Sequence, residues 1–220
     1  MTAKELISGV IPPLKNSDSG LKAIEWMQEF SVHHLPVIDK GEFLGLLSEE
    51  DILDLSDPSE AIGKHKFSLH KPFVKEGDHI FEVIKIAAQL QLSIIPVIDE
   101  HNHYQGAISL ESLINRLASF SSIEDPGGIL VLEMNKNDYS LTEISRIVES
   151  NNAQILSSMI TSHRDSTKIE VTLKLNVSDM KHVISTFERF EYKVTASFQE
   201  SDYFEHLKDH YDALMNYLNV

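Results

Sequence analysis

The chain contains no cysteine, so neither a disulfide framework nor thiol chemistry is available to it. Basic residues are also scarce: 19 Lys and Arg stand against 34 Asp and Glu, which gives a formal net charge of −15. Nucleic-acid binding requires Lys and Arg to neutralise phosphates, and anionic membranes attract basic surfaces. We therefore expect neither a nucleic acid nor a membrane as a partner.

Long apolar runs are missing as well. No stretch approaches the roughly 18 apolar residues of a membrane-spanning helix. The first residues, MTAKELI, lack the long apolar segment of a secretory signal. Hydrophobic residues still make up 42% of the 220 positions, enough for the core of one large domain or two small ones. These features predict a globular protein of the cytoplasm.

Motifs that would indicate catalysis are absent. The chain has no G-x-S-x-G, no P-loop and no G-x-G-x-x-G, and no nucleophile–base pair is recognisable. We expect no enzymatic activity and no required cofactor. The eleven histidines include His206 and His210, whose i, i+4 spacing can hold zinc. We nevertheless expect no metal site, because solvated surface histidines explain the composition.

The informative feature of the chain is a repeated segment. His34–Asp39 (HLPVID) returns as Ile94–Asp99 (IIPVID), an offset of 94 − 34 = 60 residues. After one inserted residue the offset becomes 109 − 48 = 61, which relates Ser48 to Ser109. A repeat of this size is a supersecondary unit that buries its apolar face against its copy. Two such copies leave a cleft between them, and clefts bind small molecules.

Each copy reads as strand, helix, strand, strand, helix, from the apolar runs and the helical spacing of its residues. In the first copy we expect strands at Val10–Leu14, His34–Ile38 and Phe43–Leu47, a helix from Asp18 or Ser19 to about Phe30, and a helix that begins at Ser48. In the second we expect a helix capped by Asp78, strands at Ile94–Ile98 and Tyr104–Ile108, and a helix from Ser109 to about Leu117.

Two units that each combine an apolar-apolar-Pro-Val-apolar-Asp motif with a later Gly-apolar-apolar-Ser motif resemble a tandem pair of CBS domains. The resemblance covers residues 1–121, with copies at about 1–56 and 66–121. It implies a regulatory module that binds an adenosine-containing ligand, such as AMP, ADP, ATP or S-adenosylmethionine, between the copies. It also implies that ribose and a nearby phosphate contact Ser48 and Asp51, and that the adenine slot is framed by Pro12, Leu14, His34 and Leu35.

The first copy carries the better ribose motif. One carboxylate can accept hydrogen bonds from both ribose hydroxyls, and Asp51 lies one helical turn after Ser48. The N-terminus of that helix could also offer backbone N–H groups to a phosphate. The second copy has Ser112 in place of Asp51, so we expect a weaker second site there. Its residues would be Pro72, Ile94, Ile95, Ser109 and Ser112.

Two observations leave other interpretations open. Ser48 and Asp51 have capping-box spacing, so they could cap a helix without any ligand. Glu49 and Glu50 would repel a polyphosphate, which favours a less charged adenosine compound over ATP. The alternative to a sensor is therefore a structural or interaction protein whose CBS site is vestigial.

Beyond a polar linker around residues 121–128 a different pattern begins. We expect strands at Ile129–Met134, Ala153–Ile160, Lys168–Leu175 and Tyr192–Phe198, with helices capped by Ser140 and Ser178. The βαββαβ order is ferredoxin-like and gives the whole chain an α+β fold. Placed after a CBS pair, residues 122–200 resemble an ACT domain, and the whole architecture resembles the acetoin-utilisation B type of bacterial CBS protein.

Two features of this half leave alternatives open. Asn135 and Asp138 follow the first strand and are either ligands of an amino-acid ammonium group or ordinary turn residues. Residues 201–220 have an apolar seam that predicts an amphipathic helix, docked on its own chain or paired across a dimer. That seam consists of Phe204, Leu207, Tyr211, Leu214 and Leu218. We expect a homodimer, because both kinds of domain leave apolar surfaces.

Overall fold

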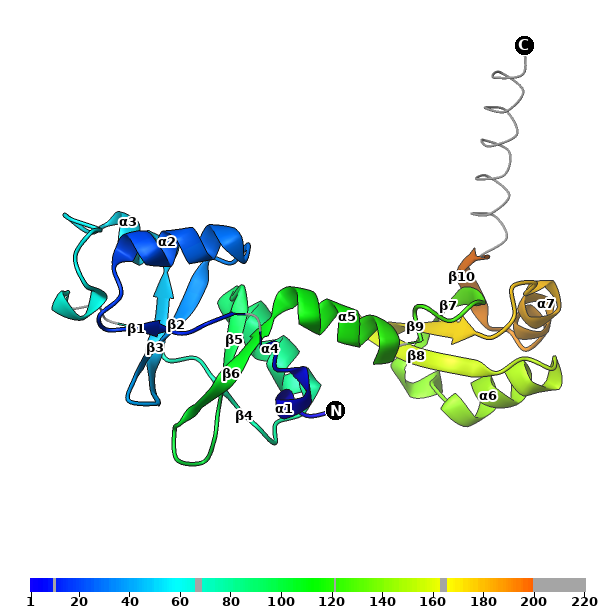
Figure 1. Ribbon diagram of the computed structural model, residues 1–220. Helices are drawn as coiled ribbons and strands as arrows, with labels where there is room; N and C mark the ends of the chain where they lie inside the picture. Colours follow the sequence, from blue (N-terminus) through cyan, green and yellow to red (C-terminus); the bar gives the residue numbers. More distant parts are fainter. Residues whose placement is uncertain (10, 66–68, 121, 163–165, 200–220) are drawn as a thin grey trace, which may run out of the picture. The chain divides into compact units, whose positions relative to one another are not determined.

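The computed structural model describes residues 1–9, 11–65, 69–120, 122–162 and 166–199. The chain divides into two compact units, Met1–Leu117 and Ala118–Val220, and the division falls inside helix α5 (Leu110–Phe120). Figure 1 labels the helices and strands of both units. The fold is α+β, with the two repeated copies in the first unit and a different sheet in the second.

The first unit contains two three-stranded sheets of identical design. In each sheet the first strand is parallel to the middle one, and the third is antiparallel to it. Leu14 pairs with Val37 and Val74 pairs with Val97, so the register repeats at the 60-residue offset. The first sheet is formed by β1 (Leu14–Lys15), β2 (His34–Asp39) and β3 (Glu42–Ser48). The second is formed by β4 (Val74–Lys75), β5 (Ile94–Ile98) and β6 (Tyr104–Ser109).

Helices cover these sheets. The first copy has α2 (Gly20–Glu29) and α3 (Glu49–Leu53), and the second has α4 (Ile80–Leu90) and α5. Two short helical segments precede the copies: α1 (Ala3–Leu6) and the 3-10 turn η1 (Ile62–Lys64). Each copy therefore shows the strand–helix–strand–strand–helix order that its sequence predicts.

A glycine marks the same irregularity in both copies. Each hairpin contains a register shift opposite Gly45 or Gly106, where φ is +151° and +154°. A Cβ atom on Gly45 would lie 2.5 Å from Cβ of Leu69, and one on Gly106 would lie 2.4 Å from Cγ2 of Ile7. Glycine is required at both positions, because the chain segment before the other copy passes directly over them.

These passing segments interlock the copies. Ser8, which precedes the first strand of the first copy, bridges to Ala107 in the second, and His70, which precedes the first strand of the second copy, bridges to Leu46 in the first. The side chains of Ala3 and Leu6 are buried in the core of the second copy. The segment before the first strand of each copy thus packs on the other copy, an arrangement that we call the exchange of segments.

Two predictions about element starts in the first unit differ from the structure. Strand β1 is confined to Leu14–Lys15 instead of Val10–Leu14, and Val10 lies outside the described residues. Helix α2 is capped by Ser19, but α4 is capped by His79 and not by Asp78. The Asp78 carboxylate instead accepts a hydrogen bond from the Lys75 backbone at 2.8 Å and closes the turn before the helix.

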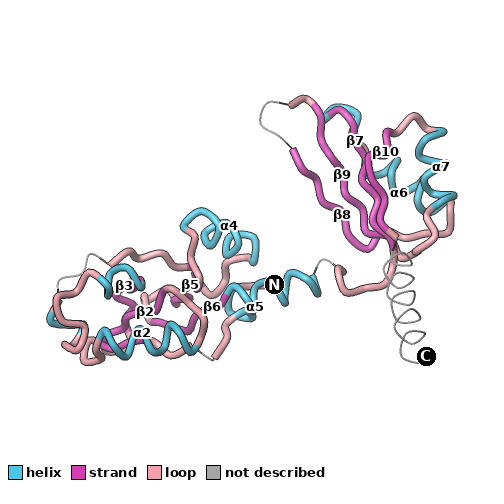
Figure 2. The backbone as a smooth tube through the Cα atoms, turned by 90° about the horizontal axis from the view of Figure 1, so that it is seen from above, coloured by secondary structure: helices cyan, strands magenta, loops and turns pink. Residues whose placement is uncertain are grey.

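The second unit is a four-stranded antiparallel sheet in the order β10-β7-β9-β8. Helices α6 and α7 lie on one face of this sheet (Figure 2). This order is the ferredoxin-like topology that the βαββαβ sequence pattern predicts. The elements are β7 (Gly128–Asn135), α6 (Leu141–Ser150), β8 (Ile155–Ser162), β9 (Lys168–Leu175), α7 (Lys181–Arg189) and β10 (Lys193–Phe198), with the 3-10 turn η2 (Lys136–Asp138) after β7.

Burial in this unit follows the alternation of β9. Ile169, Val171, Leu173 and Leu175 are buried under the helices, while the intervening residues are at least partly exposed. The prediction that Ser178 caps the second helix is wrong, because α7 begins at Lys181 and its N-cap is Met180. The Asp179 carboxylate accepts a hydrogen bond from the Lys181 backbone there instead. The predicted tail helix over residues 201–220 lies outside the described residues, as do His206 and His210.

Candidate functional site

Ser48 and Asp51 begin helix α3 and bind each other. One carboxylate oxygen of Asp51, Oδ2, accepts hydrogen bonds from the Ser48 backbone at 2.9 Å and from the Ser48 hydroxyl at 2.6 Å. The Ser48 hydroxyl oxygen in turn accepts a hydrogen bond from the Asp51 backbone at 3.1 Å. This reciprocal capping box fixes the carboxylate while leaving its second oxygen, Oδ1, without a hydrogen bond among those within this motif.

The capping box bears on the expectation that the N-terminus of this helix offers backbone N–H groups to a phosphate. The Asp51 N–H already donates to Ser48, and the Glu49 N–H donates to the His33 carbonyl at 3.0 Å. Helix α3 is also only five residues long. The start of this helix therefore does not present the set of free N–H groups that anion binding at a helix N-terminus requires.

A cavity of about 420 Å³ opens beside this capping box, between the two copies. It is within the usual range of small-molecule sites, which runs from about 300 to 1,000 Å³. The first copy supplies most of its wall, the segment before β4 supplies two residues, and the end of α4 with the turn after it supplies two leucines. The lining residues are His34, Leu46, Ser48, Glu50, Asp51, Asp54, His70, Pro72, Leu90 and Leu92.

The structure brings together only part of the predicted residue set. Ser48, Asp51 and His34 line the cavity, but Pro12 does not. Leu14 and Leu35 are 0% exposed and pack in the core of the first copy, so they do not face a ligand. Their burial follows from their positions on β1 and on the central strand β2, which is covered on both faces.

Pro72 was predicted for the second site, yet it lines the cavity beside Ser48. The exchange of segments explains this, because His70 bridges to Leu46 and carries the following residues to the first copy. The other predicted residues of the second site lie elsewhere. Ile94 and Ile95 are 0% exposed, and the Ser109 hydroxyl donates to the Ser112 hydroxyl at 3.1 Å while it accepts from the Ser112 backbone.

His34 lines the cavity, and its ring is held by a hydrogen bond and is uncharged at neutral pH. Its Nδ1 lies 3.1 Å from the Ser93 hydroxyl, which also accepts a hydrogen bond from the His33 backbone at 2.9 Å. Burial lowers the pKa of His34 below its usual value of 6.5, and the charge of His33 adds to this effect. His34 is therefore neutral at pH 7 and can exchange hydrogen bonds without bringing a positive charge to the cavity.

The cavity is strongly acidic for its size. Glu50, Asp51 and Asp54 line it, and no Lys or Arg does so among the described residues. The equivalent positions of the second copy, 61 residues further on, hold Glu111, Ser112 and Asn115. Three carboxylates of the first copy thus correspond to one in the second. The cluster of carboxylates is therefore specific to the cavity of the first copy and is not shared by both copies.

Sequence reasoning missed several lining residues. His70, Leu90 and Leu92 come from outside the first copy, and only the pairing of the copies brings them to it. A usable signal existed in the repeat itself. Leu90 and Leu92 are the 60-residue equivalents of Phe30 and Val32, which directly follow the matching helix of the first copy. A twofold arrangement places the helix end of one copy against the site of the other.

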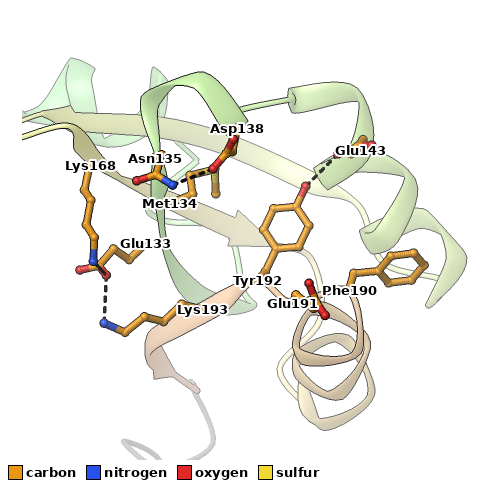
Figure 3. A pocket seen from close by; sticks show the side chains of 10 residues that line it. All are labelled: Glu133, Met134, Asn135, Asp138, Glu143, Lys168, Phe190, Glu191, Tyr192 and Lys193. Atoms are coloured by element: carbon orange, nitrogen blue, oxygen red, sulfur yellow. Dashed lines mark hydrogen bonds and ion pairs between the residues drawn. The ribbon is translucent and has the colours of Figure 1, made fainter.

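The second unit has a cavity of about 440 Å³ at the loop after β7, shown in Figure 3. Asn135 and Asp138 line it, but the Asn135 amide donates to the Asp138 carboxylate at 2.8 Å, as expected of turn residues. Glu133 accepts hydrogen bonds from Lys168 and Lys193 at 2.7 and 2.9 Å, and these bonds lower its pKa to about 2. The charged groups of this cavity are thus largely engaged with one another.

Within the part of the chain that the structure describes, no three His, Asp or Glu side chains are placed to share a metal ion. Among the same residues, no helix has the length and hydropathy needed to cross a membrane.

Comparison with known proteins finds the CBS-domain family model at residues 4–57 and 68–119. One curated relative, homoserine O-acetyltransferase of Methanocorpusculum labreanum, is 26% identical over 123 residues. That match covers 51% of this chain, and the chain spans only 23% of the length of that relative.

Among solved structures, similarity is found to a CBS domain pair/ACT domain protein from Thermotoga maritima, at 28% identity and a TM-score of 0.49. The match covers 54% of this chain and 98% of that one. The CBS domains of a transcriptional regulator from Streptococcus pneumoniae match at 19% identity and a TM-score of 0.46. There the coverage is 52% of this chain and 98% of that one.

Proposed function

Because residues 4–57 and 68–119 form a tandem pair of CBS domains, we propose that this protein is a non-catalytic regulator that binds an adenosine-containing ligand between the two copies. CBS pairs generally serve regulation by binding such ligands. The observation that carries the proposal is the cavity that joins the Ser48–Asp51 motif of the first copy to Leu90 and Leu92 of the second.

The side chains around the cavity suit the parts of an adenosine. Oδ1 of Asp51 and the Ser48 hydroxyl oxygen can accept hydrogen bonds from the two adjacent hydroxyls of a ribose. Leu46, Pro72 and Leu92 offer apolar surface to a purine, and the neutral His34 ring lies in the same wall. A ligand that touches both copies would favour one relative arrangement of them, which is how binding can shift a two-state equilibrium.

Thermal unfolding in the presence of AMP, ADP, ATP, NAD or S-adenosylmethionine tests this proposal. A ligand at about 100 times its Kd stabilises the folded state by about 2.7 kcal/mol, which corresponds to several degrees in Tm. We expect such a rise for at least one compound in the wild type and in the control Asp39→Asn, which changes an exposed carboxylate outside the cavity. Asp51→Asn should lose most of the rise.

The alternative function is that of a structural or interaction protein with a vestigial site. One observation favours it: Ser48 and Asp51 bind each other as a helix cap, and this cap accounts for both residue types without a ligand. A ligand-induced rise that is the same in Asp51→Asn and the wild type, or no rise for any compound, would support this alternative.

The second unit is proposed to be an ACT-like domain of about residues 122–200 that serves mainly in assembly, followed by an amphipathic segment at 201–220. Its β10-β7-β9-β8 order supports this assignment. We further propose a cytoplasmic homodimer. Apolar side chains on the outer face of α5 support self-association, since Leu110 and Ile114 are 39% and 64% exposed.

A further inference from the structure

We propose that the cavity of the first copy discriminates against phosphate and takes an adenosine compound whose 5′ substituent is neutral or cationic, with Glu50 and Asp54 as the residues that determine this specificity. The inference rests on the proposed function, since it concerns the ligand of the same cavity. It goes further by assigning the charge of the ligand and the residues that select it.

The first argument is the charge of the wall. Glu50, Asp51 and Asp54 all line a cavity of about 420 Å³, and the described residues place no Lys or Arg in it. A phosphate that carries up to two negative charges would be held within several ångströms of two carboxylates besides Asp51. Like charges at such distances repel each other, and at a protein surface this repulsion is only partly screened by water. A cationic group in the same place gains a comparable attraction.

The second argument is independent of the acidic side chains. Phosphate sites without basic residues depend on free backbone N–H groups. Here the N–H groups of Glu49 and Asp51 are already bound, to the His33 carbonyl and the Ser48 hydroxyl. The Ser48 N–H is bound to Asp51 Oδ2 as well. The ring of His34 adds no compensating charge near pH 7, because burial lowers its pKa.

The second copy shows what the motif looks like without this acidity. At the positions equivalent to Glu50, Asp51 and Asp54 it has Glu111, Ser112 and Asn115. The fold therefore tolerates neutral residues at two of the three positions. Glu111 also supplies a matched control, because it is the second residue of α5, as Glu50 is of α3, but does not line the cavity.

The experiment is isothermal titration of the full-length protein with adenosine, 5′-methylthioadenosine, S-adenosylmethionine, AMP and ATP at low and moderate salt. We expect adenosine or one of the two thio compounds to bind at least about tenfold more tightly than AMP and ATP, and the gap to narrow as salt screens the carboxylates. In the double variant Glu50→Gln/Asp54→Asn the ratio of AMP affinity to adenosine affinity should rise about tenfold. Glu111→Gln should leave that ratio unchanged.

The single variants Glu50→Gln and Asp54→Asn are titrated too, and an unchanged circular-dichroism spectrum establishes that each variant is folded. Tighter binding of AMP or ATP than of adenosine and the thio compounds by the wild type would overturn the specificity while leaving the proposed function intact. The specificity would also be overturned if the ratio of AMP affinity to adenosine affinity were the same in both single variants and in the wild type. Failure of every compound to bind would instead remove the proposed function and this inference together.

Discussion

At the scale of single residues, Gly45 and Gly106 make the close packing of the two copies possible. Both lie at φ values above +150°, and both are crossed by a segment that belongs in sequence to the other copy. A side chain at either position would have to displace Leu69 or Ile7. The conformation and the close approach together exclude every residue but glycine.

We therefore predict that Gly45→Ala is strongly destabilising, by about 2 kcal/mol or more, because strain from a disfavoured φ adds to a backbone and side-chain clash. The measurement is chemical denaturation with urea. Gly77→Ala is the matched control, since an added Cβ there meets nothing within 4 Å. Its free energy of unfolding should stay within about 0.5 kcal/mol of the wild type. Equal effects of the two substitutions would contradict the proposed clash.

Individual residues also show where sequence reasoning reaches its limit. Ser48 and Asp51 were predicted at the site because their chemistry is local, and they do line the cavity. Leu14 and Leu35 were predicted beside them but are buried in the core of the first copy, because the spacing along the chain does not show which residues near the motif turn inward. Pro72 was predicted for the second site but lines the cavity beside Ser48, because the crossing of the segment before β4 is a property of the fold and leaves no mark in the local pattern.

At the scale of elements, the strands and helices with a clear period were predictable. Strand β9 alternates cleanly and was predicted to the residue, and the paired strands β2 with β3 and β5 with β6 follow from the repeat. Helix starts were less predictable where several polar residues compete for the cap. Asp78 and Ser178 have the right chemistry, but His79 and Met180 occupy the N-cap positions.

Helix α5 presents a face that bears on the proposed dimer. Leu110 and Ile114 are one turn apart and exposed, and Leu110 borders an apolar depression of about 480 Å³ together with Ile84 and Leu113. If this face forms the contact between the two chains of a dimer, Ile114→Lys places an unpaired charge in the interface. We expect that variant to elute as a monomer in size-exclusion chromatography with light scattering.

Leu21→Lys serves as the control, because Leu21 is 52% exposed on α2 and not on α5. This control should keep the mass of the wild type. A dimeric Ile114→Lys protein would show that α5 is not the interface, and a monomeric wild type would show that the dimer does not exist.

At the scale of the whole molecule, the exchange of segments makes each copy depend on residues of the other within the first unit. Helix α1 contributes Ala3 and Leu6, which are 0% and 2% exposed, to the core around β4, β5 and α4. The turn η1 is bound to the first copy in the same way, through hydrogen bonds from Ile62 to Asp18 and from Gly63 to Asn16. Neither copy is complete without residues that precede the other.

We predict that Leu6→Ala destabilises the first unit by about 2 to 4 kcal/mol, the usual range for truncating a buried leucine. The loss should be uneven. Hydrogen exchange should show weaker protection in β4–β6 and α4, whereas β1–β3 should lose less. Leu53→Ala, which changes a side chain that is 71% exposed, should alter neither pattern. Equal deprotection of both copies would mean that α1 stabilises the unit as a whole and not the second copy in particular.

The bridge between Ser8 and Ala107 also has a consequence for synthesis on the ribosome. The hydroxyl of Ser8 bonds to a carbonyl 99 positions later in the chain. At roughly 5 to 20 residues per second, the segment around Ser8 must wait several seconds for its final partner to be synthesised. Until then Leu6 has no core to enter, so its apolar side chain stays exposed during synthesis and offers a site to a chaperone.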